Sequence, residues 1–122
     1  MEFALHVHRD HLELTVGGEF DLVAGKAGAD ELFRQCAEHA LSRVLVDATQ
    51  LSDHVTVGSR FTLGEYLAAR GTRPIRIAIV TSTILVGASK ALENTANNRG
   101  AQVITTDSME KALEFLGLAN QT

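Results

Sequence analysis

The sequence has one cysteine, Cys36, one proline and no tryptophan among its 122 residues. A single cysteine excludes a disulfide within the chain and a zinc site built from several thiolates. Five phenylalanines and one tyrosine are too few to predict a platform on which nucleobases stack. Acidic and basic residues are mixed along a chain of net charge −4, without a basic stripe to neutralise phosphates. We therefore expect no binding to nucleic acid.

Long apolar runs are also missing. No segment approaches the roughly 20 residues that a membrane-spanning helix needs, and the N-terminal residues lack the charged and apolar regions of a signal peptide. These absences predict no membrane partner and a cytoplasmic location. The length predicts one domain, residues 1–122, large enough to bury a core.

What the sequence does contain is a regular alternation of strand-like and helix-like segments. Apolar residues recur at every second position in 3–7 and 12–16, which predicts an antiparallel hairpin. We expect further strands at 44–46, 75–80 and 101–105, and about four helices, at 22–41, at 59–70, between Ser82 and Gly100, and after Ser108. The order ββαβαβαβα predicts an α/β fold with a mixed five-stranded sheet. The hairpin supplies an antiparallel edge, and right-handed crossovers make the later strands parallel.

In the predicted helix at 59–70, hydrophobicity decides which face is assigned to the core. Phe61, Leu63, Gly64, Leu67 and Ala68 are placed on the inner side, and Arg60 on the exposed face. Cys36 is placed on the inner face of the first helix, where small thiols are commonly buried.

The stretch at 44–66 reads VLVDATQLSDHVTVGSRFTLGEY: a short buried strand, a polar loop and a helix that begins near Gly58. This arrangement resembles the central unit of STAS domains, and the order of elements resembles that fold over almost the whole chain. The second half is similar to SpoIIAA-like, STAS-related bacterial proteins, both in the strand at 76–80 and in the closing helix at 108–116. The resemblance implies a non-enzymatic regulatory module that binds a protein partner, and we expect that it can form a homodimer.

The chain departs from the antagonist motif of that family at one position. The family motif is Asp-Ser-Ser/Thr-Gly, phosphorylated on the residue before the glycine, whereas this chain has Val55, Thr56, Val57 and Gly58. Val57 cannot accept a phosphate. Thr56 and Ser59 are the nearest hydroxyls and remain the candidate phosphosites.

Polar residues follow the predicted third and fourth strands, where open α/β sheets tend to meet ligands and partners. These partner- or ligand-binding residues are Asp47, Thr49, Asp53, His54, Thr56, Gly58 and Ser59 on the first loop, and Thr81, Ser82 and Thr83 on the second. Helices begin directly after both loops, so their free N–H groups could hold an anion. Alternatively, the hydroxyls only cap those helices. The alternative function is therefore a sensor of small anionic or lipid-like molecules.

The histidines are the residues that could indicate a metal site or a catalytic site. His6, His8, His11 and Glu13 fall on neighbouring hairpin strands, but an exposed polar sheet face accounts for the same pattern. His54 beside Asp53 has no convincing nucleophile to activate. We therefore predict no catalytic residues, no metal and no cofactor.

Overall fold

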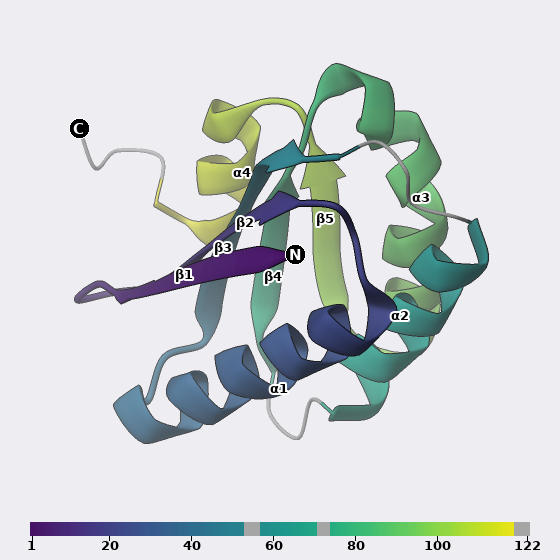
Figure 1. The fold of residues 1–122 in the computed structure, drawn as a ribbon. Helices are drawn as coiled ribbons and strands as arrows, with labels where there is room; N and C mark the ends of the chain where they lie inside the picture. Colours follow the sequence, from purple (N-terminus) through teal and green to yellow (C-terminus); the bar gives the residue numbers. More distant parts are fainter. Residues whose placement is uncertain (53–56, 71–73, 119–122) are drawn as a thin grey trace.

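The structure is a computed structural model, and it describes residues 1–52, 57–70 and 74–118. Its elements, shown in Figure 1, are β1 (Glu2–Val7), β2 (Leu12–Gly18), α1 (Leu22–His39), β3 (Arg43–Leu51), α2 (Val57–Arg70), β4 (Arg76–Val80), α3 (Thr83–Asn98), β5 (Gln102–Thr106) and α4 (Met109–Leu116). The predicted order ββαβαβαβα is confirmed.

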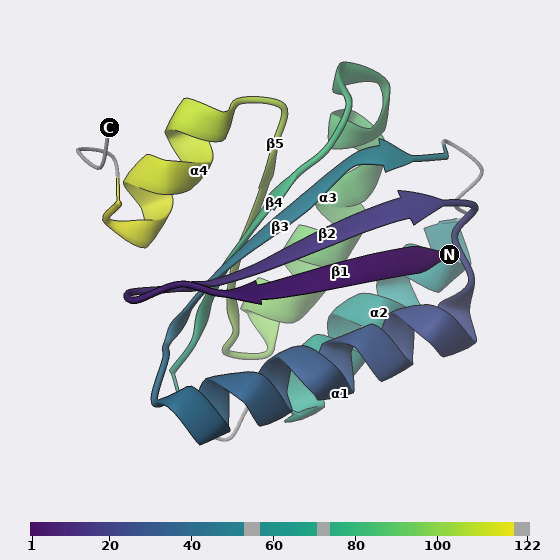
Figure 2. The ribbon, with the colours of Figure 1, turned by 60° about the vertical axis from the view of Figure 1, so that its left-hand side comes forward.

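The five strands form one sheet in the spatial order β1-β2-β3-β4-β5. β1 pairs with β2 antiparallel, and every later neighbour is parallel, as predicted. Each parallel crossover steps to the next strand in the same direction, so right-handed connections place α1, α2 and α3 on one face. Figure 2 shows these three helices on one side of the sheet and α4 on the other.

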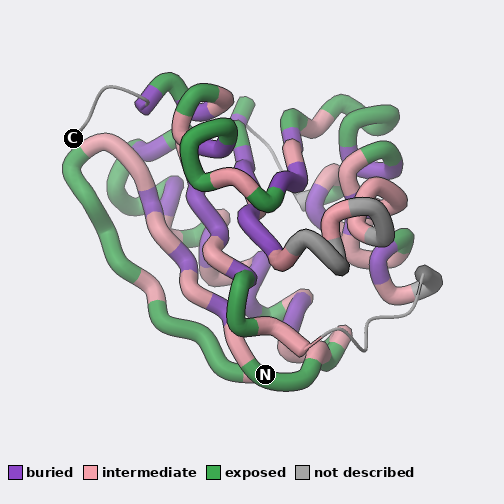
Figure 3. Tube along the Cα trace, turned by 90° about the horizontal axis from the view of Figure 1, so that it is seen from above, coloured by how far each residue is buried: buried purple, intermediate pink, exposed green. Residues whose placement is uncertain are grey.

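Two apolar clusters follow from the alternation of side chains along the strands. The larger cluster lies between the sheet and α1–α3 and includes Leu12, Val44 and Ile77. The smaller cluster lies under α4 and includes Leu45 and Leu116. Buried residues are concentrated on the central strands, whereas β1 is mostly exposed (Figure 3).

β3 is longer than the predicted strand at 44–46, and this corrects the placement of two site residues. Pairing with β2 continues as far as Gly18 opposite Leu51, and Ala48 is buried in the larger cluster. Asp47 and Thr49 therefore lie within the strand and not in a loop. By alternation they occupy the face that carries Leu45, away from the larger core.

The rotation of α2 about its axis also differs from the prediction. Arg60 is buried, with 6% of its surface exposed, and Phe61 is 45% exposed. The buried stripe is Arg60, Leu63, Gly64 and Leu67, with spacing i, i+3, i+4 and i+7. Phe61 lies about 100° around the helix from Arg60. There its ring stacks under the guanidinium of Arg99, at 5.6 Å from the ring centroid.

Gly64 explains this rotation. A Cβ at this position would lie 2.8 Å from the carbonyl oxygen of Leu92 and 3.0 Å from the Cβ of Thr95, both in α3. α2 and α3 therefore approach so closely that only glycine fits at the contact. With Gly64 facing α3, helical spacing turns Arg60 toward the interior.

Side chains of α3 protect the outer edge of β5. The amide of Asn97 bonds both backbone groups of Val103, at 2.8 and 2.9 Å. Glu93 accepts from the Thr105 N–H at 2.7 Å, and Lys90 donates to the Thr105 carbonyl at 2.9 Å. These bonds satisfy backbone groups that would otherwise be able to pair with a strand of another chain. The opposite edge strand, β1, has no such cover among the described residues.

The helix ends match the predicted signals in part. Ser108 caps α4, because its side chain accepts from the N–H of Lys111 at 3.2 Å. Ser82 occupies the N-cap of α3, but its side chain makes no capping hydrogen bond. Cys36 is buried, as predicted.

Across the described helices, none combines the length and the apolar character that crossing a membrane requires.

We predict that Gly64→Ala destabilises the protein, although alanine favours a helix interior by about 1 kcal/mol. The new methyl meets the backbone carbonyl of Leu92, so the helices must separate, and overpacking of this kind costs about 1–3 kcal/mol. Urea unfolding measures the change. The matched control is Gly25→Ala, whose methyl meets side chains and not backbone, namely Phe20 at 3.3 Å and Leu63 at 3.9 Å. Equal effects of the two substitutions would contradict the close helix contact.

Candidate functional site

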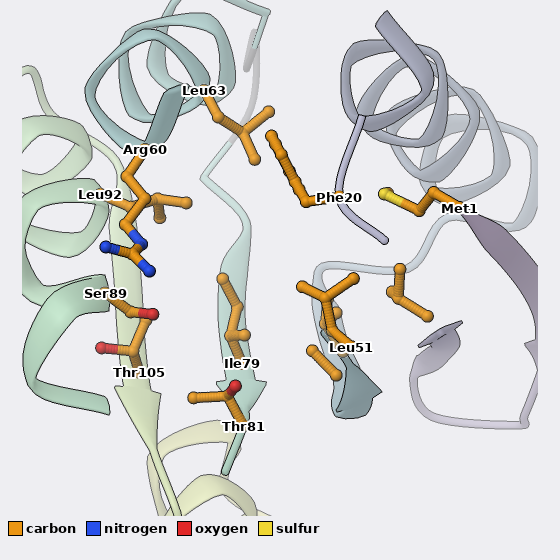
Figure 4. Close-up of a pocket in the computed structure, with 13 residues that line it drawn as sticks. Met1, Phe20, Leu51, Arg60, Leu63, Ile79, Thr81, Ser89, Leu92 and Thr105 are labelled. Carbon is orange, nitrogen blue, oxygen red and sulfur yellow. The ribbon is translucent and has the colours of Figure 1, made fainter. Parts of the chain in front are cut away.

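A cavity of about 110 Å³ lies between the sheet and helices α2 and α3 (Figure 4). It is lined mainly by apolar side chains from the carboxyl-terminal parts of the strands and from both helices. The lining residues are Met1, Val16, Phe20, Val46, Ala48, Leu51, Arg60, Leu63, Ile79, Thr81, Ser89, Leu92 and Thr105. Among these described lining residues, Arg60 is the one with a charged side chain.

In the described part of the chain no carboxylate pairs with the Arg60 guanidinium, and its nitrogens keep some access to solvent, because no fully buried side-chain nitrogen or oxygen there lacks a hydrogen-bond partner. Burial lowers the pKa of the Arg60 guanidinium. Taking an ion of this kind out of water costs several kcal/mol unless an opposite charge or hydrogen bonds offset it. The guanidinium of Arg60 thus borders the cavity without an opposite charge from the described residues.

Three hydroxyl groups line the same cavity. Figure 4 shows the guanidinium of Arg60 pointing toward Ser89, on α3, and Thr105, on β5, with Thr81 nearby. Thr81 and Thr105 are almost fully buried. Hydroxyl groups can donate to an anion's oxygens, although the one hydroxyl hydrogen of Thr105 is directed to Glu93. The positive charge at this end of the cavity comes from Arg60.

An acidic group that contacts this end, Glu93, is paired with a lysine. Glu93 accepts from the Thr105 N–H at 2.7 Å and from the Thr105 hydroxyl at 3.4 Å. Its carboxylate is also paired with the ammonium of Lys90 at 3.2 Å. Glu93 thus holds Thr105 in place through two hydrogen bonds, and Lys90 balances the negative charge of Glu93.

The other end of the cavity is apolar. Met1, Phe20 and Leu63 approach one another there (Figure 4). A second cavity, of about 80 Å³, extends beneath α1. It shares five lining residues with the first, namely Met1, Val16, Val46, Leu63 and Ile79. The site is therefore amphipathic, with charge at the α3 and β5 end and hydrocarbon toward α1.

The structure separates two of the residues that the sequence grouped as a site from a third. Thr81 lines the cavity. Asp47 lies on the opposite face of the sheet, where it accepts from the backbone N–H of Thr49 at 3.1 Å and from the Thr49 hydroxyl at 2.7 Å. The predicted cluster that joins Asp47 and Thr49 to Thr81 is therefore wrong, because β3 continues past Asp47 and alternation turns these two residues away.

The remaining predicted residues lie around the starts of two helices. Gly58 and Ser59 fall in the first turn of α2, and Ser82 and Thr83 fall at the start of α3. Asp53, His54 and Thr56 lie outside the described residues. Phosphorylation of Thr56 or Ser59 stays a prediction.

Sequence reasoning missed Arg60, the central residue of the cavity, by placing it on the exposed face. A signal was nevertheless present. Arg60, Gly64 and Leu67 share a helical stripe, and a glycine within a helix commonly marks close packing. Had Gly64 been used to set the buried face, Arg60 would have been placed inside and Phe61 outside.

No protein-family model matches the sequence, and no curated protein matches it either. Among solved structures, the chain is similar to the anti-sigma factor antagonist SpoIIAA in its unphosphorylated form. The sequences are 14% identical, the TM-score is 0.40, and the match covers 97% of this chain and 83% of that one.

We predict that Arg60→Met leaves the ligand-free protein equally stable or makes it more stable. Methionine keeps the length of the buried stem and removes an unpaired charge, and replacements of buried ions by apolar groups are often neutral or stabilising by about 1–4 kcal/mol. Urea unfolding measures this change. The control is Arg99→Met, because Arg99 is partly exposed and paired with Glu65 at 3.2 Å. A large loss of stability in the Arg60 variant would show that Arg60 is a structural residue.

Proposed function

We propose that the protein is a non-enzymatic regulatory module that binds a small amphipathic anion in the cavity beside α2. One observation carries the proposal: Arg60 is buried and unpaired by any described residue, at the polar end of an otherwise apolar cavity. The cost of burying this charge is offset when an anion enters. An apolar ligand alone leaves the guanidinium unsatisfied. The ligand therefore needs an anionic group for Arg60 and an apolar group for the rest of the cavity.

The geometry of arginine and the size of the cavity narrow the ligand to a carboxylate with a small apolar body. A guanidinium presents a planar fork that matches the two oxygens of a carboxylate. An apolar cavity of about 150 Å³ in another protein accepts benzene. The cavities of about 110 and 80 Å³ here therefore suit a single ring or a short acyl chain.

The chemistry of the lining supports binding rather than catalysis. The cavity presents the hydroxyls of Thr81, Ser89 and Thr105, and its described lining contains no histidine, cysteine, aspartate or glutamate. A hydroxyl needs an adjacent base before it can act as a nucleophile. In the described lining, the polar groups can orient an anion but cannot activate one another.

A protein partner, which the sequence resemblance implied, is our second proposal. Phe61 supports it, because a 45% exposed aromatic ring on the outer side of α2 is the kind of side chain that anchors interfaces. Glu65 and Arg99 form an ion pair beside it. A homodimer through the uncovered edge of β1 also remains a proposal.

We predict that benzoate stabilises the protein and that benzamide, its neutral counterpart of the same shape, does not. A ligand at a free concentration of ten times its dissociation constant adds about 1.4 kcal/mol to the free energy of unfolding. This increase raises the Tm by roughly 5 °C in a domain of this size. Thermal unfolding and calorimetric titration measure the effect, with hexanoate and hexanamide as a second matched pair for an acyl chain.

Two variants test separately the binding of the ligand's carboxylate and the binding of its apolar part. Arg60→Met should abolish the preference for benzoate over benzamide, whereas Ala48→Leu should block both by filling the cavity, because Ala48 lines it. Arg99→Met, outside the cavity, should behave as the parent protein. Equal shifts for benzoate and benzamide, or an unchanged benzoate response in the Arg60 variant, would refute the proposed site.

A further inference from the structure

A second group of chemically active side chains lies at the turn between β1 and β2, on the part of the sheet that no helix covers. His8, His11 and Glu13, which we term the hairpin cluster, each offer one ligand atom, and these three atoms lie within 4.8 Å of one another. We propose that the hairpin cluster binds a divalent transition-metal ion such as Zn²⁺. This inference is independent of the cavity and its ligand.

The hairpin register brings the three residues together. Val7 pairs with Leu12 and His6 with Glu13, and the His8 N–H donates to the His11 carbonyl at 2.9 Å to close the turn. Side chains of directly opposite and diagonal residues on one face of an antiparallel pair are neighbours. The backbone thus holds the three side chains at one end of the sheet, whether or not a metal is bound.

The side chains are already close to a coordinating arrangement. His8 Nε2 lies 2.7 Å from Glu13 Oε1, where it donates to the carboxylate, so a metal ion bound between these two atoms would replace that hydrogen. The His8 and His11 rings stack with centroids 4.5 Å apart and planes at 16°. Zinc bonds of about 2.0–2.2 Å place the atoms of a tetrahedral site roughly 3.5 Å apart. Small rotations of these partly exposed side chains close the remaining distance.

Asp10 provides the outer contact that metal-binding histidines usually have. Its carboxylate Oδ1 lies 2.7 Å from His11 Nδ1. A carboxylate can only accept, so Nδ1 carries the proton and Nε2 keeps the lone pair that a metal needs. This is the carboxylate–histidine–metal arrangement, which fixes the tautomer and orients the ring.

The donor set selects the class of metal. Two imidazoles and one carboxylate suit zinc, copper or nickel, whereas magnesium and calcium prefer sites made of oxygen alone. Three protein ligands leave one coordination position open for water or for a group from another molecule. The sequence alone predicted only a polar sheet face here, because the contacts of His8 with His11 and Glu13 and of His11 with Asp10 depend on the geometry of the turn.

Calorimetric titration of the full chain with ZnCl₂, after removal of metals with EDTA, tests the proposal. We expect one zinc per chain. His8→Ala and His11→Ala should each weaken binding by at least about tenfold, and Asp10→Asn should weaken it by about 10–100-fold through the outer contact alone. His39→Ala is the matched control, because His39 is an exposed histidine at the end of α1 and should leave the affinity unchanged.

Cobalt absorption gives a second readout that separates loss of the site from loss of the fold. Co²⁺ bound by nitrogen and oxygen ligands should give visible bands in the parent protein and in His39→Ala, and weaker or shifted bands in Glu13→Gln. Circular dichroism confirms that each variant is folded. Absence of zinc binding by the parent protein, or equal binding by a folded variant that lacks both His8 and His11, would overturn the proposal.

Discussion

The close contact between α2 and α3 at Gly64 is the constraint on which the functional part of the structure depends. The missing side chain lets the two helices approach until the backbone of α3 lies against α2. That approach fixes the rotation of α2, and the rotation places Arg60 inside and Phe61 outside. An apparently local feature, one glycine in a helix, thus determines where the buried positive charge of this protein lies.

The layering of the fold gives this charge its surroundings. Successive right-handed crossovers gather α1, α2 and α3 on one face of the sheet, and the space between them and the strands is filled almost entirely by hydrocarbon. Where α2 and α3 meet the carboxyl ends of the strands, the filling is incomplete, and Arg60, Ser89 and Thr105 border the gap. On the other face α4 covers only part of the sheet (Figure 2), and in the hairpin cluster His8 is exposed while His11 and Glu13 are partly buried.

The order and pairing of the elements could be predicted because each depends on local periodicity and on the handedness of crossovers. The errors arose where tertiary contacts decide. The end of β3 was placed at the first charged residue, Asp47, although pairing with β2 carries the strand on to Leu51. The hydrophobic pattern predicts Phe61 inside, because that pattern contains no information on the contact between Gly64 and Leu92. Of the predicted site residues whose side chains the structure describes, Thr81 is the one that lines the cavity.

The most direct test of the account follows the Nε–Hε signal of Arg60 by ¹⁵N NMR while benzoate is added to the full chain. If the guanidinium is an unpaired receptor within the cavity, this signal moves downfield and saturates with the same dissociation constant as the titration heat. The signals of Arg99 and Arg34, which are already paired with Glu65 and Glu31, stay in place. An Arg60 signal that does not move, or that moves equally with benzamide, would contradict the central claim.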